Sequence, residues 1–429
     1  MTGPGDGAPA KSGSRLRTFR SLGTRNYRLF AIGQVVSNSG TWMQRVAQDW
    51  LVLQLTHGSG TALGIATGLQ FLPMLASPWG GAVADRYSKR RILMMTQTAM
   101  GLLALILGVL AVTGTVRVWQ VFALAFGLGL ATVVDNPTRQ AFVTEMVGHA
   151  DMPNAIALNS AIFNLARIAG PAAAGLVIGA LGTPTAFFLN AASYLAVLTG
   201  LKLMRPGELH PVERVPRQRG QLREGFAYVR ARPELLLPMV LIFFVATFGM
   251  NFQVTNALMS RQVFHTGATA FGVASAVFAV GALAGALLAA RRSKPGLRLL
   301  VTAAFSFGLL EVLTALMPSF WLFLAMLVPT GLILLTLNTA ANSTVQLASA
   351  PDMRGRVMGL YMLVLLGGAP LGSPMVGWVA EHFGPRMSLL AGGVISAAAA
   401  GVIGLLVARR RGVGARDYLR PAALARMVA

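Results

Sequence analysis

Apolar segments of about 20 residues recur along the whole chain, and mostly short polar intervals separate them. A segment of this kind crosses the hydrocarbon core of a bilayer as a helix. The chain of 429 residues is 55% hydrophobic and only 12% charged, so most of it is suited to lipid rather than to water. We predict an all-α integral membrane protein with twelve transmembrane helices. The predicted spans are 27–55, 61–83, 92–113, 118–136, 154–181, 184–203, 235–260, 268–290, 297–316, 320–342, 354–381 and 385–408.

The positive charges favour one orientation of these helices. The formal net charge is +22, and most of the 36 Lys and Arg residues fall in the termini and in alternate loops. Basic loops stay on the cytoplasmic side, so we expect both termini in the cytoplasm and a location in the cell (inner or plasma) membrane. The positive charge on the cytoplasmic side then attracts anionic lipid of the inner leaflet. We therefore expect no nucleic-acid partner. The exceptions are Arg28, Arg45, Arg117, Arg167, Arg261 and Arg386.

The longest polar interval divides the chain into two pseudo-symmetric six-helix halves. Paired motifs support a repeat, since Asp151–Met152 before the fifth span corresponds to Asp352–Met353 before the eleventh. Leu222, Phe226 and Tyr228 lie among charged residues in this interval and predict a short amphipathic helix. The predicted order is a cytoplasmic tail over 1–26, a six-helix bundle over 27–203, a cytoplasmic linker over 204–234, a second bundle over 235–408 and a basic cytoplasmic tail over 409–429.

Several function classes find no support in the sequence. The chain has no Cys, which excludes disulfides and thiolate metal sites, and its five His are scattered. It contains no nucleotide-binding Gly-x4-Gly-Lys-Ser/Thr sequence and no clustered catalytic set. The first apolar run is too long and too polar for a cleavable signal sequence. We expect no enzyme activity, no cofactor and no metal.

Four motifs resemble those of one transporter family. They are Gly80 to Arg91 between the second and third spans, Trp42 to Gln48, Asp135 to Phe142, and Asn154 to Pro171. Together they resemble the drug and siderophore efflux branch of the major facilitator superfamily, to which the enterobactin exporter and macrolide-efflux-like proteins belong. The resemblance implies a twelve-helix fold, rocking alternating access and export driven by an ion gradient. Unlike many proton antiporters of that superfamily, this chain has no Arg inside the fourth span.

The fifth span carries a motif similar to the antiporter motif of that superfamily. Gly170, Pro171 and Gly175 belong to it, with Ala where Gly is usual at two other positions. Small residues still let helices approach closely, so we predict a helix-packing role for these three.

The first span carries a polar stripe on one helical face. Gln34, Asn38, Arg45 and Asp49 recur at three- and four-residue intervals, and Trp42 lies among them. Polar groups at membrane depth face protein or water. One interpretation is that the stripe lines a central substrate cavity, with Asp49 as a proton carrier and Arg45 as its partner. The other is a structural pair that braces the helix.

Three further charges lie in predicted spans. Asp135, placed near the inner end of the fourth span, is either compensated by Arg139 in a structural role or takes a proton from the cavity. Arg167 is buried in the fifth span and needs an anionic partner, which would be Asp49, Asp135 or an anionic substrate. Glu311 has no partner in its own span and is expected to be neutral near the outer surface.

In the second half, polar but uncharged residues correspond by repeat to those of the first, and a run of Phe is interpreted either as an apolar wall of the predicted cavity or as ordinary lipid and helix contacts. An apolar wall with a few polar groups suits an amphiphilic ligand. The substrate-cavity candidates there are Phe248, Asn251, Phe252 and Asn338.

The basic turn after the second span is the predicted gate. Gly80 precedes it, and Asp85 lies at a helix C-terminus, where the helix dipole disfavours an acid. We expect Asp85, with Arg86 and Arg90, to close the cytoplasmic side of an outward-open state; the alternative is that this turn only determines the orientation of the helices. The predicted partners across the interface between the halves are Arg354 and Arg356.

The sequence thus predicts a proton-coupled exporter of amphiphilic, drug-like or siderophore-like small molecules. Its expected partners are the substrate, protons and membrane lipids, and it is expected to be a monomer. Two alternatives stay open: a lipid or lysophospholipid translocator, and a transport-inactive membrane sensor or scaffold.

Overall fold

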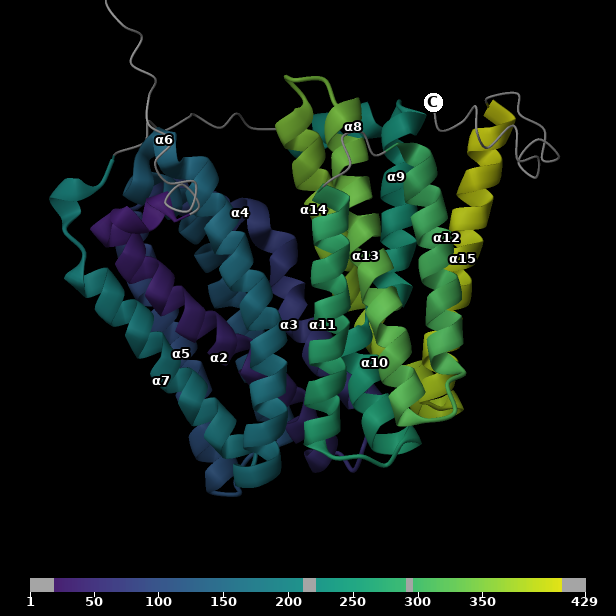
Figure 1. Ribbon diagram of the computed structural model, residues 1–429, viewed down its shortest axis with the longest axis horizontal. Helices are drawn as coiled ribbons and strands as arrows, with labels where there is room; N and C mark the ends of the chain where they lie inside the picture. Colours follow the sequence, from purple (N-terminus) through teal and green to yellow (C-terminus); the bar gives the residue numbers. More distant parts are fainter. Residues whose placement is uncertain (1–18, 211–220, 291–295, 411–429) are drawn as a thin grey trace, which may run out of the picture.

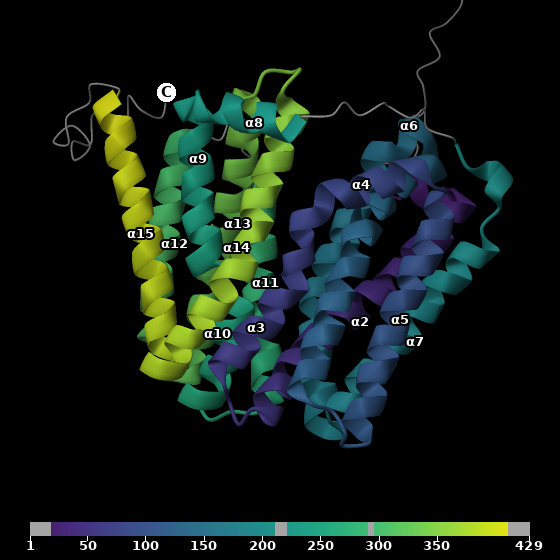
Figure 2. The same ribbon diagram turned by 180° about the vertical axis from the view of Figure 1, so that it is seen from behind.

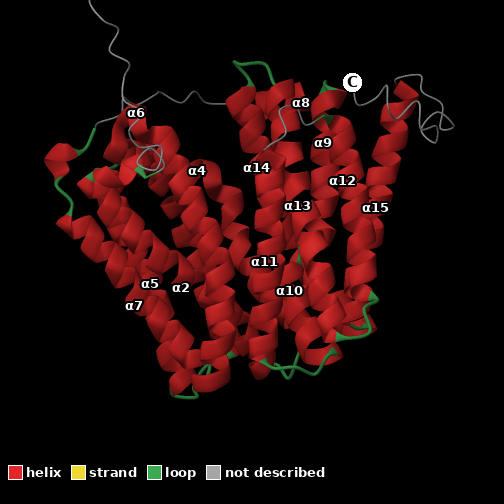
Figure 3. Cartoon of the chain, in the orientation of Figure 1, coloured by secondary structure: helices red, strands yellow, loops and turns green. Residues whose placement is uncertain are grey.

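The computed structural model describes residues 19–210, 221–290 and 296–410. Within these ranges the chain is almost entirely helical and has no strand (Figure 3). Ten of the described helical stretches are long and apolar enough to cross a membrane. The prediction of an all-α membrane architecture is confirmed at this level. Most of the two predicted tails lies outside the described residues.

The first two predicted spans are helical but are not among these ten. α2 (Arg25–Leu55) is long enough, but its polar and charged residues make it less apolar than the others. The second predicted span is interrupted near Pro73 and Pro78, because proline removes a backbone donor from the helix. It forms α3 (Gly60–Phe71), the 3-10 helix η2 (Leu72–Ala76) and α4 (Ser77–Arg86).

The helices from α2 to α7 form the N-terminal group. A continuous helical stretch covers the fourth and fifth predicted spans and breaks at Gly148, whose φ of 69° favours glycine. The expectation that the fourth span ends near Asp135 is wrong, since the helix continues through Pro137 as far as Gly148. The remaining elements of the group are η1 (Arg20–Gly23), α5 (Lys89–Val112), α6 (Val118–Leu181) and α7 (Thr183–Leu203).

The helices from α9 to α15 form the C-terminal group. Its first predicted span is divided into α9 (Pro233–Phe244), the π-helix η4 (Val245–Gly249), α10 (Phe252–Leu258) and the π-helix η5 (Met259–Val263). Single π-turns of this kind are frequent at functional sites. The others are α11 (Ala268–Ala290), α12 (Leu297–Ala315), α13 (Phe320–Ala348), α14 (Arg354–Phe383) and α15 (Pro385–Arg410).

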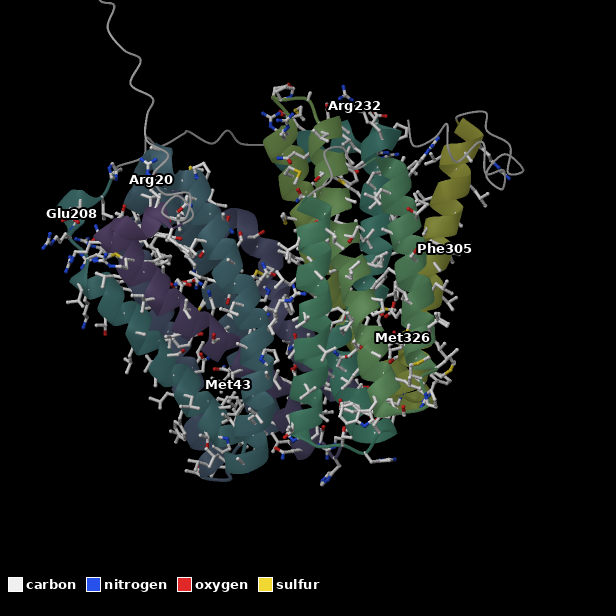
Figure 4. All side chains as sticks on the ribbon, viewed as in Figure 1. Arg20, Met43, Glu208, Arg232, Phe305 and Met326 are labelled. Carbon is white, nitrogen blue, oxygen red and sulfur yellow. The ribbon has the colours of Figure 1, made fainter. Side chains whose placement is uncertain are left out.

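Figures 1 and 2 show the two groups side by side. η3 (Pro206–Glu208) and α8 (Gln221–Arg230) lie between them in the chain, and α8 is at one end of the molecule, where the ribbons of the groups diverge. Arg20, Glu208 and Arg232 lie at this same end (Figure 4). We call it the basic end, and we use outer end as a name for the opposite end, where α3 meets α14.

Glycines let the two groups touch near the outer end. A Cβ on Gly64 of α3 would lie 2.2 Å from the carbonyl oxygen of Ser373 in α14, and one on Gly60 would lie 2.5 Å from that of Gly377. No other residue fits such contacts without displacing backbone. Leu63, Leu258 and Phe271 belong to one buried apolar cluster that both groups share. The groups are therefore closely packed where α3 meets α14.

Candidate functional site

A cavity of about 300 Å³ lies between the two groups of helices. Residues of α2 and of the second segment of α6 form one wall, and residues of α10, α11 and α13 form the other. Most of its lining is apolar or aromatic, with few charged groups, which is typical of a site for a small amphiphilic molecule. The lining residues are Trp42, Arg45, Val46, Asp49, Arg167, Pro171, Met250, Phe252, Gln253, Asn256, Phe271, Ser275, Phe278, Ala279, Leu334, Leu335 and Asn338.

Asp49 links the two walls of this cavity. It is fully buried, and its Oδ2 accepts a hydrogen bond of 2.7 Å from Nε2 of Gln253 in α10. Its Oδ1 has no hydrogen-bond partner among the described residues. One carboxyl oxygen therefore holds α10, while the other remains available to a proton or a ligand.

Arg45 lies one helical turn before Asp49 and is held by aromatic rings. Its guanidinium carbon lies 4.6 Å from the ring centre of Trp42 and 5.6 Å from that of Phe71. A cation over an aromatic face is stabilised by the negative face of the ring. Among the described contacts there is no Arg45–Asp49 ion pair, and Arg45 Nε has no partner. Arg45 is thus oriented in the cavity without being neutralised by direct contact.

Arg167 brings a second cation to the cavity from α6. The hydrogen bonds and ion pairs of the described residues include none made by this side chain. Two guanidinium groups and one carboxyl group therefore line the same space. This charge set can hold an anionic or zwitterionic group of a ligand.

The opposite wall is aromatic. Phe252 stacks on Phe278 with ring centres 4.4 Å apart. The amide oxygens of Asn256 and Asn338 are buried and have no partner in the described part of the chain. Apolar surface with isolated polar atoms is suited to recognition of an amphiphile.

Asp135 belongs to a separate buried network inside the N-terminal group. Its carboxylate accepts hydrogen bonds of 2.8 Å from Thr96 and Gln97 and forms an ion pair with Arg139, one turn along α6. Arg139 also donates to the amide oxygens of Gln34 and Asn38. The polar stripe of α2 therefore divides, since Gln34 and Asn38 bind Arg139 and do not line the cavity.

Two other predicted cavity residues also lie outside its lining. Asn251 donates to the carbonyl of Thr247 at 2.8 Å and accepts from Ser373 Oγ of α14 at 2.8 Å. Phe248 stacks on Phe244 with ring centres 6.4 Å apart. Both residues lie at the break in the seventh predicted span.

The small residues of the fifth predicted span lie at two helix crossings. A Cβ on Gly170 would lie 2.5 Å from Cβ of Trp42, so this glycine lets α6 approach α2. Gly175 meets Thr269 of α11, whose hydroxyl donates to the Gly175 carbonyl at 2.9 Å, and the carbonyl of Pro171 faces Gly272. These crossings hold the second segment of α6 against α2 and α11, which line the cavity together with it.

The predicted gate residues lie toward the basic end. Gly80 packs against α6, where a Cβ would lie 2.1 Å from the Val133 carbonyl oxygen. Arg90 donates to the Leu201 and Lys202 carbonyls at the end of α7, at 2.7 and 3.2 Å. Asp85, Arg86 and Arg354 are exposed, and Arg356 pairs with Glu224 of α8.

At the outer end, α14 caps α3 through contacts that the sequence analysis missed. Oε2 of Glu381 accepts hydrogen bonds of 2.8 Å from Ser59 Oγ and from the Thr61 amide. Gln262 of η5 donates to the Gly58 carbonyl at 2.6 Å. A signal was present in the sequence, because Ser59 precedes a helix as an N-cap and Glu381 is an acid near the outer end of a span. The pairing itself depends on the fold.

Comparison with known families decides the class of protein. The family described as transmembrane secretion effector, within the major facilitator superfamily, matches residues 17–419. The chain belongs to this family. It is therefore a multi-pass membrane transporter and not an enzyme.

Relatives with named functions are similar over most of their length. The staphyloferrin A transporter of Staphylococcus aureus is 26% identical over 80% of this chain and 87% of its own. The multidrug efflux pump Tap of Mycolicibacterium fortuitum is 26% identical over 85% of this chain and 91% of its own length. The enterobactin exporter EntS of Shigella flexneri is 24% identical over 86% of this chain and 88% of its own length.

Solved structures agree on the fold. A bacterial homologue of the human lysosomal transporter Spinster, in an inward-facing and unoccupied conformation, superposes with a TM-score of 0.71. The two share 15% identity over 92% of this chain and 97% of the other. The fold of this transporter is thus that of the major facilitator superfamily, with the cavity between its two groups of helices.

Proposed function

We propose that this transporter exports amphiphilic small molecules of the drug or siderophore class by rocking alternating access. The observation that carries the proposal is the cavity, in which aromatic rings, two arginines and one buried carboxyl converge from both groups of helices. The names of the relatives, a siderophore transporter, a siderophore exporter and a multidrug pump, support this substrate class.

We infer that the membrane domain has twelve spans in two six-helix halves. α2 and the interrupted stretch of α3, η2 and α4 add two spans to the ten apolar ones, since each lies beside them in its group (Figure 1). The basic end then faces the cytoplasm with both termini. Contact between the groups at the outer end and divergence at the basic end correspond to an inward-facing state.

Proton antiport is the proposed source of energy, with Asp49 as the coupling acid. Asp49 faces the cavity with one oxygen unpartnered, so it can exchange a proton with a ligand-accessible space. Asp135 has Thr96, Gln97 and Arg139 as partners and is enclosed by protein. We therefore assign Asp135 a structural role.

In the outward-open state, the basic end must close. We propose that Asp85 and its basic neighbours then meet the start of α14, where Arg354 and Arg356 lie. Arg356 pairs with Glu224 in the present state, so closure exchanges one acidic partner for another.

Transport by purified protein in liposomes tests the export proposal. With an imposed proton gradient, uptake of a cationic dye, a macrolide or a catecholate siderophore into liposomes by inside-out molecules is expected in wild type. Asp49→Asn should abolish the dependence on the gradient, whereas Asp352→Asn, at an exposed acid outside the cavity, should not. Transport of lysolipids alone would indicate a lipid translocator. Absence of transport for every compound would indicate a sensor or scaffold.

A further inference from the structure

Glu311 is a second carboxyl group at membrane depth, and it lies outside the cavity. It belongs to α12, four residues before the helix ends at Ala315, and is only 2% exposed. On the same helix, Phe305 is 50% exposed and faces outward (Figure 4), whereas Phe307 is fully buried. Glu311 therefore points into the C-terminal group and not toward lipid.

Two glycines make room for this carboxyl group. A Cβ on Gly249 of η4 would lie 3.0 Å from Oε2 of Glu311 and 2.8 Å from Oγ of Ser396 in α15. A Cβ on Gly392 would lie 3.0 Å from Oε1 of Glu311 and 2.5 Å from the carbonyl oxygen of Phe248. The carboxyl group thus lies between the π-helix η4 and α15, with a hydroxyl and a backbone carbonyl beside it.

Two polar atoms at this point lack partners. Oε2 of Glu311 and Oγ of Ser396, which both lie near Gly249, are buried without a hydrogen bond among the described residues. Buried polar atoms are normally paired, so a group of unpaired ones indicates a site that changes its occupancy or its geometry.

No positive charge is available to compensate a carboxylate here. The elements that pack on α12 are α9, η4, α13 and α15. In the described residues, η4 and α13 have no charged side chain, and the charges of the others lie near helix ends, at Glu234, Arg386 and Arg409. Arg386 donates to the carbonyl of Ala315 at 3.1 Å, and Arg298 is at the far end of α12. An uncompensated anion at this depth is costly, so the carboxyl group must carry a proton in this state.

The site is connected to the cavity through aromatic contacts. Phe307, one turn before Glu311, packs edge-on against Phe252 with ring centres 6.1 Å apart. Phe252 lines the cavity and begins α10, three residues after η4 ends at Gly249. A change in the geometry of η4 would therefore alter both the cavity wall and the surroundings of Glu311.

We propose that Glu311, with Ser396, forms a second proton-binding site that holds its proton in the inward-facing state and releases it when η4 rearranges and the outer end opens. On release, the carboxyl O–H bond breaks and water entering from the outer end takes the proton. The proposal rests on the proposed alternating access. In it, η4 is the element that connects proton binding at Glu311 with the cavity.

Infrared difference spectroscopy of the protein in lipid nanodiscs tests this site without any substrate. The carbonyl stretch of a protonated carboxyl group is expected in wild type at neutral pH. Glu311→Gln should remove it, and Ser396→Ala should shift its frequency while keeping the acid. Asp352→Asn, at an exposed acid, should leave it unchanged.

The outer end can be opened by Gly64→Trp, because a Cβ alone at this position would already overlap the Ser373 carbonyl. In that variant the Glu311 signal should be lost at neutral pH. If Glu311→Gln removes nothing from the wild-type spectrum, or if the signal is identical in wild type and in opened Gly64→Trp, the proposed site is wrong. Since no substrate is present, failure of the export assay leaves these outcomes unaffected.

Discussion

Asp49 and Gln253 are hydrogen-bonded across the two groups of helices, with Oδ2 of the acid 2.7 Å from Nε2 of the amide. They are 204 positions apart in sequence, and both line the cavity. A buried carboxyl group has few ways to gain a donor, so this bond stabilises the conformation in which α2 and α10 are close. Protonation or ligand contact at Asp49 therefore acts on the same bond that joins the groups.

Removal of the donor should weaken this conformation. Gln253→Leu keeps the volume but leaves the Asp49 carboxyl without its partner, at a cost of about 2 kcal/mol. The inward-facing population should fall accordingly, as measured by spin-label distances between cysteine pairs introduced into the otherwise cysteine-free chain. Gln120→Leu is the matched control, since that side chain bonds only its own helix start at Arg117. Equal distance distributions in wild type and Gln253→Leu would contradict the assignment.

The contact between Glu381 and the start of α3 should control opening of the outer end. Glu381→Gln replaces charge-assisted hydrogen bonds to Ser59 and Thr61 by neutral ones. If the free energy that favours the closed outer end falls by about 1.4 kcal/mol, the open population increases tenfold. A cysteine placed at Ala380, which is 2% exposed, should then react faster with a membrane-impermeant thiol reagent.

Glu208→Gln is the control for that experiment, because Glu208 also pairs with a neighbour but lies at the basic end. The labelling rate at Ala380→Cys should be the same with and without this substitution. If Glu381→Gln has no more effect than Glu208→Gln, the cap on α3 does not hold the outer end closed.

The helical membrane fold could be predicted from the sequence because the long apolar runs leave few other folds available in lipid. The breaks were harder to predict. The helix continues through Asp135 and Pro137 as far as Gly148, and Arg139, one turn on, pairs with the acid inside it. Local sequence alone gives Pro137 as an end of a span.

The candidate site could be predicted only in part. Arg45, Asp49 and Arg167 stand out because charges are rare in apolar runs, and the fold does bring them to one cavity. The partners of Gln34 and Asn38 could not be found by spacing on α2, since Arg139 reaches them from α6, about 100 residues away. Gln253 was likewise missed as the donor to Asp49, because a contact between distant helices leaves no periodic pattern.

A large side chain at Gly64 should prevent closure of the outer end. The Cβ position lies 2.2 Å from the Ser373 carbonyl oxygen, so Gly64→Trp is incompatible with the present packing of α3 on α14. Labelling at Ala380→Cys should increase at least as much as with Glu381→Gln. Gly401→Trp is the control, because a Cβ there meets nothing within 4 Å. Unchanged labelling in a folded Gly64→Trp protein would mean that the two groups do not separate at this crossing.

The network around Asp135 should determine stability rather than coupling. Asp135→Asn leaves Arg139 without its anion inside the N-terminal group, and removing one partner of a buried ion pair costs about 3 kcal/mol. The midpoint of thermal unfolding in detergent should fall clearly below that of wild type and of Asp352→Asn, whose acid is exposed. Export by the Asp135→Asn protein that remains folded should still depend on the proton gradient, because Asp49 is intact. A normal midpoint with lost dependence on the gradient would reverse the roles assigned to the two acids, making Asp135 the group that exchanges the proton.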